Sequence, residues 1–140
     1  MFCDFVGTGG TFAGVARFLK EQRQAITCLV VEPAGAPVLA GHPPSDPSHR
    51  IQGGGYAMAD LPLLEEHLVD GYLTVNDDEA MDAARRLARS EGILAGFSAG
   101  ACLAAAEQWL IGPGAGGTVA IVLADSGMKY LSTDLWEPPK

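Results

Sequence analysis

Five small residues near the start of the chain have the types and spacing to bind a phosphate group: Gly7, Thr8, Gly9, Gly10 and Thr11. They directly follow the apolar run 2–6 and directly precede a stretch, 12–20, with the pattern of a helix. A strand that ends in a glycine turn and opens a helix gathers free backbone N–H groups at the positive end of the helix dipole. This arrangement favours a phosphate dianion, and the two threonines add hydroxyl groups.

The spacing of the glycines distinguishes between phosphate ligands. The dinucleotide pattern G-x-G-x-x-G fails because its sixth position is Phe12, and the nucleoside triphosphate loop fails because no Gly-Lys-Ser/Thr follows. A compact loop of small residues can enclose one phosphate monoester rather than a pyrophosphate, which makes pyridoxal 5'-phosphate the leading candidate. From the loop alone, a glycine-rich strand–helix turn without a ligand stays an open alternative.

Strands and helices alternate along the rest of the chain. We expect strands at 2–6, 26–31, 72–75, 93–96 and 119–124, and helices at 11–23, 62–68, 77–90 and 99–110. The runs 26–31 and 119–124 are almost continuously apolar, as strands covered on both faces are. The pattern predicts one α/β domain over residues 1–140, with a doubly wound, mostly parallel sheet and helices on both faces.

Charge and composition narrow the possible partners. The 140 residues include 17 acidic and nine basic ones, for a formal net charge of −8, which argues against nucleic acid and anionic membranes as partners. No apolar run approaches a membrane span and no signal peptide pattern is present, so we expect a cytoplasmic protein. Three cysteines are expected to be buried reduced thiols rather than disulfide or metal ligands, and no metal site is expected: Cys3, Cys28 and Cys102.

Four further segments follow the glycine loop in a recognisable order. They are Val31-Glu32-Pro33 with 36–39, His49-Arg50-Ile51-Gln52-Gly53, 76–89 continuing through 92–101, and 124–134, which begins Ala124-Asp125-Ser126-Gly127. Together with the loop, they resemble in order and spacing the C-terminal half of the cysteine synthase (O-acetylserine sulfhydrylase) and cystathionine β-synthase group. These are fold type II pyridoxal phosphate enzymes, and the resemblance covers nearly the whole chain. It implies the large-domain fold of that group and pyridoxal 5'-phosphate as the cofactor.

The resemblance also implies how the cofactor would be held. The loop 7–11 would bind the phosphate, and Ser126, beyond the last parallel strand, would hydrogen-bond the pyridine nitrogen. A plain Asp-Ser-Gly turn is the alternative, and the neighbouring Asp125 would challenge the assignment if it pointed inward. A neutral hydroxyl does not protonate that nitrogen as a carboxylate partner would, which makes the ring a weaker electron sink. Elimination of a β-leaving group and addition of a nucleophile suit such a ring.

The resemblance places a second glycine-rich segment on the substrate side of the cofactor: Gly53, Gly54, Gly55 and Tyr56. Glycine has no Cβ, so the backbone can approach a ligand closely. The pattern in the family is nearer Gln-Gly-Ile-Gly-Ala-Gly-Phe, so Gly54 and Tyr56-Ala57-Met58 depart from it, and this departure leaves the substrate open. Tyr56 either contacts substrate or packs within the loop.

Two motifs of the family have no counterpart in this sequence. They are the lysine that forms a Schiff base with the cofactor and the Ser/Thr-Gly-Asn-type loop that holds the substrate carboxylate, and both belong to the N-terminal half. The lysines, which lack a Ser-Val-Lys-like context and so inherit no catalytic role, are Lys20, Lys129 and Lys140. We therefore expect part of a transferase or lyase that performs β-replacement on an O-activated serine in cysteine biosynthesis, and no activity from this chain alone.

The expected partners follow from the same resemblance. A small amino acid would be the substrate of the intact enzyme, and the chain would form a homo-oligomer or associate with a complementary N-terminal half. A non-catalytic half that pairs with another polypeptide is an alternative, because a sheet edge and apolar surface would otherwise be exposed.

Two enzyme or binding alternatives rest on single motifs. Gly96-Phe97-Ser98-Ala99-Gly100 spells the G-x-S-x-G of a hydrolase, but all three histidines precede Ser98, whereas the hydrolase order needs one after it. A nucleotide-binding module would use Glu32 as its ribose-binding acid, but the fingerprint loop of such a module is absent.

Overall fold

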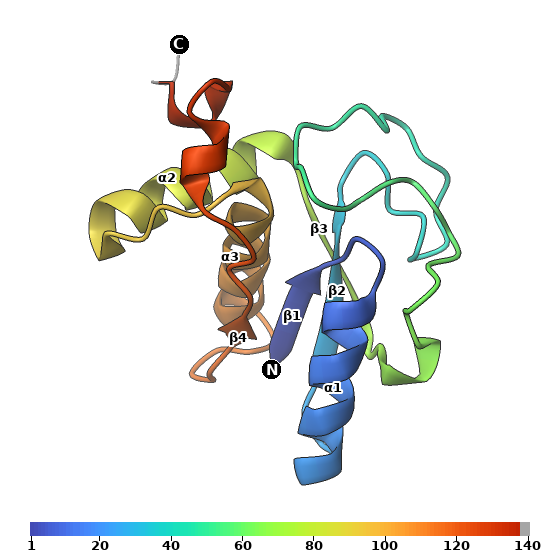
Figure 1. The fold of residues 1–140 in the computed structure, drawn as a ribbon. Helices are drawn as coiled ribbons and strands as arrows, with labels where there is room; N and C mark the ends of the chain where they lie inside the picture. The colour runs from blue at the N-terminus through green and yellow to red at the C-terminus, as the bar shows by residue number, and fades with distance from the viewer. Residues whose placement is uncertain (138–140) are drawn as a thin grey trace.

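A four-stranded parallel sheet forms the centre of the computed structural model, which describes residues 1–137 (Figure 1). Its strands are β1 (Phe2–Phe5), β2 (Cys28–Pro33), β3 (Gly71–Val75) and β4 (Ala120–Ile121), in the spatial order β3-β2-β1-β4. Every neighbouring pair is parallel, and Phe2 of β1 lies opposite Cys28 on one side and Ala120 on the other. The expected α/β fold with a parallel sheet is confirmed.

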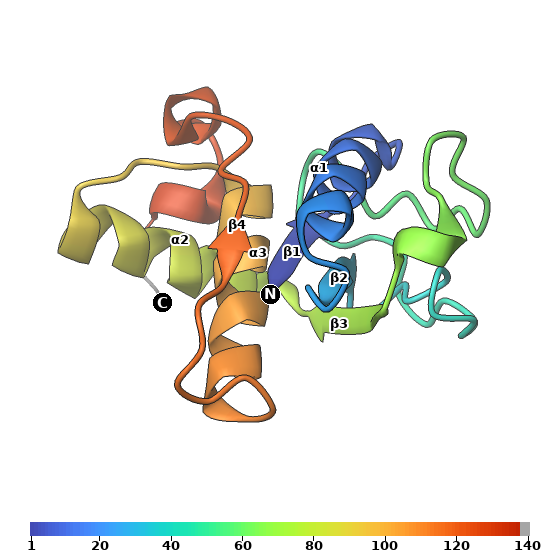
Figure 2. The same ribbon diagram turned by 90° about the horizontal axis from the view of Figure 1, so that it is seen from below.

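Helices cover both faces of this sheet (Figure 2). Helix α1 (Gly10–Gln22) packs Phe12, Ala13 and Ala16 into one core together with Phe2 of β1. Helices α2 (Asp77–Glu91) and α3 (Phe97–Ile111) lie on the other face, where α3 packs against Cys3 and Phe5 of β1 and α2 packs against α3. Because side chains alternate along a strand, β1 contributes Phe2 to one core and Cys3 and Phe5 to the other. None of the helices within residues 1–137 combines the length and the apolar character that crossing a membrane requires.

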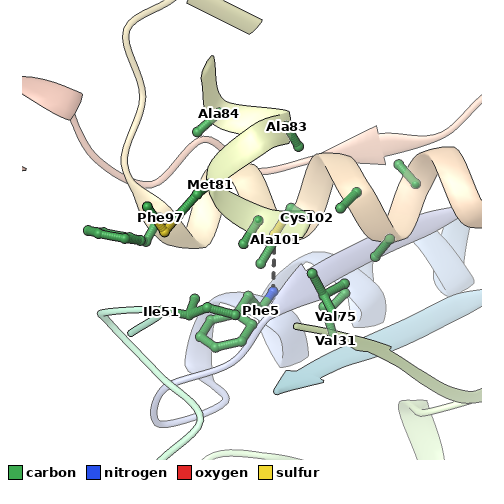
Figure 3. Close-up of a cluster of buried hydrophobic side chains, with 14 of the residues drawn as sticks. Phe5, Val31, Ile51, Val75, Met81, Ala83, Ala84, Phe97, Ala101 and Cys102 are labelled. Carbon is green, nitrogen blue, oxygen red and sulfur yellow. Dashed lines mark hydrogen bonds between the residues drawn. The ribbon is translucent and has the colours of Figure 1, made fainter. Parts of the chain in front are cut away.

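In the core under α2 and α3, the helices contribute mainly alanines together with Met81 and Phe97, and the strands contribute Phe5, Val31 and Val75 (Figure 3). Ala101 and Cys102 of α3 face Phe5 and Val31, and the backbone N–H of Phe5 donates to Cys102 Sγ at 3.2 Å. All three cysteines are buried and free, as expected. The small residues let α3 lie close to the sheet, which brings its N-terminus to the carboxyl end of β1.

Helix α2 follows the local signals of its sequence. The Asn76 side chain accepts from the Glu79 N–H at 2.9 Å, and the Glu79 side chain accepts from the Asn76 N–H at 2.8 Å, which completes a capping box. Gly92 ends the helix at a φ of 70°, a left-handed conformation that glycine adopts without strain.

Three of the expected elements differ in the structure. Residues 93–96 do not form a strand, because only an isolated antiparallel bridge joins Ala95 to Ser126 before α3 begins. The helix expected at 62–68 is reduced to a 3-10 turn, Glu66–Leu68, since Leu61 and Leu68 are buried under α1 and the Leu63 N–H donates to the Thr8 carbonyl. Strand β4 keeps two residues of the expected 119–124. Tertiary packing outweighs local pattern in each case.

The long connection between β2 and β3 is ordered and folds over the end of the sheet from which the glycine loop leaves (Figure 1). Arg50 anchors it, because its side chain pairs with Asp77 and Asp78 at the start of α2 and with Asp134 in the C-terminal segment. That segment adds two 3-10 turns, Gly127–Tyr130 and Asp134–Trp136. Arg85 of α2 also holds it, donating to the carbonyls of Leu135 and Asp134.

The contact between α2 and α3 depends on Gly100, and this gives a test of the fold. A Cβ at Gly100 would lie 2.0 Å from the Ala80 carbonyl oxygen, so Gly100→Ala should lower the free energy of unfolding by about 1–3 kcal/mol. Gly14 of α1 is the matched control, since nothing lies within 4 Å of its would-be Cβ. Gly14→Ala should raise the free energy of unfolding by about 0.5–1 kcal/mol. Urea unfolding of both variants checks this, and equal effects would contradict it.

Candidate functional site

A cleft of about 330 Å³ opens at the carboxyl ends of β1 and β4. The entire glycine loop 7–11 lines it, and the other polar or loop residues in its wall come from four separate segments: Asp4, Gly53, Tyr56, Ser98 and Asp125. The structure thus brings the two glycine-rich segments of the sequence to one cavity. Ligands of open α/β sheets bind at this edge of the sheet.

The N-terminus of α1 supplies the donors of the cleft. Gly9 is the N-cap residue at a φ of 88°, no side chain caps the helix, and the first turn holds no acidic residue. The first N–H groups of a helix have no intrahelical acceptor, so they stay available to a ligand. Thr8 and Thr11 lie exposed beside them. These donors fit a phosphate group, although no Lys, Arg or His side chain among residues 1–137 lines the cleft.

Close packing fixes the shape of the glycine loop. A Cβ at Gly9 would lie 2.7 Å from the backbone nitrogen of Leu64, and one at Gly7 would lie 2.8 Å from the Gly53 carbonyl oxygen. Real Cβ atoms do not come so near other heavy atoms. The loop therefore needs glycine at these two positions to fit under the long connection.

The second glycine segment divides between two tasks. Gly53 and Tyr56 line the cleft, and the Tyr56 side chain is largely exposed, so it does not pack as a core residue. Gly54 and Gly55 do not line the cleft. The Gly55 N–H donates to the Val6 carbonyl at 3.1 Å, and a Cβ at Gly54 would lie 2.3 Å from the same oxygen. These two glycines attach the segment to the end of β1.

His49 positions this segment, a role that the sequence analysis missed. Its Nε2 lies 2.7 Å from the Gly55 carbonyl oxygen, and its ring meets Phe5 edge to face. A carbonyl only accepts, so Nε2 carries the proton and donates. The buried Nδ1 has no hydrogen-bond partner among residues 1–137. Its place between Phe5 and Gly55 results from the folding of the long connection, so the sequence alone does not show it.

Ser126 lies beside the cleft and outside its lining. Its hydroxyl oxygen accepts from the Met128 N–H at 3.3 Å, which caps a 3-10 turn. The neighbouring Asp125 does line the cleft, where its Oδ2 accepts from the Tyr130 hydroxyl and its buried Oδ1 has no partner in the described chain. Burial, followed by the bond to Asp125, raises the pKa of Tyr130 to about 12. Asp125 thus lies in the cleft wall while Ser126 does not, which is the challenge to the Ser126 assignment that the sequence analysis named. The contact of Ser126 with a ring nitrogen stays a prediction.

Asp4 is a second cleft residue that the sequence analysis missed. It is only 6% exposed, and burial raises its pKa to about 6, with a smaller opposing effect from the backbone N–H of Phe5. The sequence gives no signal for this, because an aspartate inside an apolar run says nothing of the cavity beyond the strand.

In the described residues, neither single-motif alternative has the arrangement that its function needs. Both carboxylate oxygens of the buried Glu32 accept backbone N–H groups, from Leu39 at 2.7 Å and from Ala40 at 3.0 Å. Ser98 lines the cleft, but no histidine within residues 1–137 hydrogen-bonds it. Burial raises the pKa of Cys3 to about 12 and that of Cys102 further, so both thiols are neutral. No cluster of metal-ligating side chains was found in the described residues.

Neither of the two lysines in the described residues lines the cleft. Lys20, near the far end of α1, pairs with Asp70 at 2.6 Å. Lys129 is exposed and lies 3.8 Å from Asp125. Lys140 falls outside the described residues.

Known proteins are similar to this chain over most of its length. A family model described as pyridoxal-phosphate dependent enzyme matches residues 2–125. The cysteine synthase of Staphylococcus aureus is 43% identical over 132 residues, which is 94% of this chain and 41% of the relative. A probable cysteine synthase of Bacillus subtilis is 42% identical, covering 93% and 41%. The chain therefore spans about 41% of the length of the curated relatives that it matches.

Solved structures of similar proteins superpose on nearly the whole chain. The O-acetylserine sulfhydrylase isoform 3 of Entamoeba histolytica superposes with a TM-score of 0.88 at 33% identity, covering 99% of this chain and 41% of the other. The O-acetylserine dependent cystathionine β-synthase of Helicobacter pylori superposes with a TM-score of 0.85 at 37% identity, covering 96% and 43%.

The buried carboxyl of Asp4 gives a prediction about stability. Its pKa of about 6 in the folded chain exceeds the ordinary value, so its favourable contribution is complete in acid and is lost as the pH rises through about 6. Asp4→Asn should therefore be more stable than the parent chain by about 1–3 kcal/mol at pH 8, and by much less at pH 4. Urea unfolding at both pH values measures this. The exposed Asp60, changed to Asn, is the control, and a gain of the same size there would refute the assignment.

Proposed function

The chain belongs to the family of pyridoxal-phosphate dependent enzymes, and from this premise we propose that it is the cofactor-holding, C-terminal part of a cysteine synthase-like enzyme. The intact enzyme would carry out β-replacement on an O-activated serine, with sulfide or another thiol as the nucleophile. The observation that carries the proposal is the uncapped N-terminus of α1 behind the glycine loop 7–11, which faces Gly53 and Tyr56 across one cleft.

The glycine loop would hold the phosphate of pyridoxal 5'-phosphate through backbone donors. The free N–H groups of the first turn of α1 and the hydroxyls of Thr8 and Thr11 surround a space that no acidic side chain of that turn enters. The positive end of the helix dipole favours the phosphate there. When bound, the cofactor supplies an electron sink for breaking bonds of an amino-acid substrate.

Ser126 would hydrogen-bond the pyridine nitrogen. Its Oγ accepts from the Met128 N–H, so the serine O–H proton remains to be donated to an unprotonated ring nitrogen. The Gly96 N–H donates to the Asp125 carbonyl at 3.2 Å, and Asp125 accepts from Tyr130, which together hold the backbone that carries Ser126. A neutral partner of this kind favours elimination and replacement at the β-carbon over chemistry that needs a protonated ring.

This function requires a complementary N-terminal segment as partner, because the relatives are more than twice as long as the chain. Strand β4 pairs on one side only, with β1. Exposed apolar side chains lie in the segment before α3 and in the segment after β4: Leu94, Leu123, Met128 and Leu131. Such a surface supports docking of another segment. Pairing without catalysis is the second candidate function.

Cofactor binding tests the phosphate site. Gly9→Ala places a Cβ against Leu64 at a φ of 88°, so the loop must move. We expect binding of pyridoxal 5'-phosphate, followed by absorbance, to weaken at least about tenfold, whereas the control Gly14→Ala in the same helix should bind like the parent chain. Circular dichroism checks that both fold. Thr11→Val, which removes one hydroxyl and disturbs no contact, should weaken binding by about fivefold. Unchanged affinity in both loop variants would count against the site.

The covalent state of the cofactor tests the role of the lysines. After borohydride reduction of the loaded chain, mass analysis of peptides should find no specific adduct at Lys20 or Lys129, because one is paired with Asp70 and the other is exposed beside Asp125. The chain alone should then show no β-replacement with O-acetylserine and sulfide. A stoichiometric adduct at Lys129 that Lys129→Arg removes, together with activity, would overturn the assignment of the catalytic lysine to a segment outside this sequence.

A further inference from the structure

Asp4 occupies an unusual place for an ionisable group. It is the third residue of β1, it is 6% exposed, and it lines the same cleft as the glycine loop. Side chains alternate along a strand, and Phe2 and Val6 point into the core under α1, so Asp4 points to that face as well. Its carboxyl group therefore lies on the side of the sheet that carries the N-terminus of α1.

No basic side chain among residues 1–137 lines the cleft beside Asp4. Its polar neighbour is the backbone N–H of Phe5, and it has no hydrogen bond to another side chain within residues 1–137. The titratable groups that line the cleft with it are Asp125 beyond β4 and Tyr56 on the long connection, and the thiols of Cys3 and Cys102 lie in the core on the opposite face of the sheet. Lys129 is largely exposed and forms an ion pair with Asp125. A second anion in this cleft would thus meet a carboxyl group that has no counter-ion.

We propose that Asp4 selects the charge state in which this cleft binds a phosphate monoester, because the carboxyl group takes up a proton from solvent when the dianion binds. The inference rests on the proposed function in one respect, namely that the cleft binds phosphate at the glycine loop. The ionised carboxylate and the phosphate dianion would share one cleft and repel each other in a partly desolvated space. The neutral carboxyl removes the repulsion and becomes an O–H donor.

The coupling has a defined sign. Burial already raises the pKa of Asp4 to about 6 in the free chain, and a bound anion raises it further. Below both values the carboxyl is neutral with or without ligand, so affinity is highest there. Between the two values affinity falls about tenfold for each unit of pH, and above both it levels off.

Sulfate is the appropriate probe, because a phosphate monoester itself titrates near pH 6 while sulfate remains a dianion throughout the range. We would follow the backbone amides of 7–11 by NMR during sulfate titrations of the whole chain from pH 5 to pH 8. The affinity of the parent chain should fall by about tenfold or more, that of Asp4→Asn should stay within about twofold, and that of the control Asp60→Asn should follow the parent.

Two further measurements keep the outcomes separate. Carbon-detected titration of the Asp4 carboxyl in the parent chain should show its pKa rising when sulfate is added, and this needs no variant to fold. Calorimetry with pyridoxal 5'-phosphate at pH 7, in buffers of different ionisation enthalpy, should show more proton uptake by the parent than by Asp4→Asn. Binding with the same pH dependence in both chains overturns the inference alone. Absence of any binding, to either chain, overturns the inference and the proposed phosphate site together.

Discussion

The site depends on the backbone contact between the end of β1 and the second glycine segment. The Gly55 N–H donates to the Val6 carbonyl, and Gly54 leaves no room for a Cβ beside the same oxygen. This contact ties a long connection, which has little regular structure of its own, to the strand that leads into the glycine loop. His49 and Arg50 secure the connection on either side of it, through Gly55 and through the start of α2. Without this contact, the cleft would lose the part of its wall that Gly53 and Tyr56 form.

Local sequence signals predicted the elements whose caps and turns are formed by residues close to them in the sequence. Helix α2 has its capping box and closing glycine within 17 residues, and α1 begins at the predicted loop. The sequence prediction failed for the elements whose structure is determined by residues distant in the sequence. Residues 93–96 carry a strand-like apolar pattern, but their neighbour is the turn at Ser126, which supports a single bridge. Of the residues around the cleft, the sequence analysis named the glycine loop, Gly53 and Tyr56, whose binding roles stay predictions. It gave no role to Asp4 or to His49, because their surroundings arise from tertiary neighbours.

The electrostatic character of the cleft follows from its construction. Phosphate sites often use Lys or Arg, yet the cleft wall within residues 1–137 contains two aspartates and no basic side chain. If the cleft binds an anion as proposed, the attraction must come from backbone N–H groups and the dipole of α1, which are fixed by the fold and do not titrate. The affinity would then be set by the path of the glycine loop, and its variation with pH by the carboxyl groups. Backbone geometry and side-chain ionisation would thus control different properties of one site.

Asp4 connects the stability of the fold with the chemistry of the cleft. An ionised carboxylate with no counter-ion, buried in the central strand, lowers the free energy of unfolding at neutral pH, and an apolar or amide side chain of similar size would avoid that loss. Groups that destabilise a fold in this way concentrate at functional sites, where the unfavourable environment is what shifts their proton affinity. Under the proposal above, a bound anion shifts Asp4 to its neutral form, which removes the buried charge and with it the repulsion between the carboxylate and the anion. Stability gained on binding and protons taken up on binding should therefore change together with pH, since one carboxyl group is the source of both.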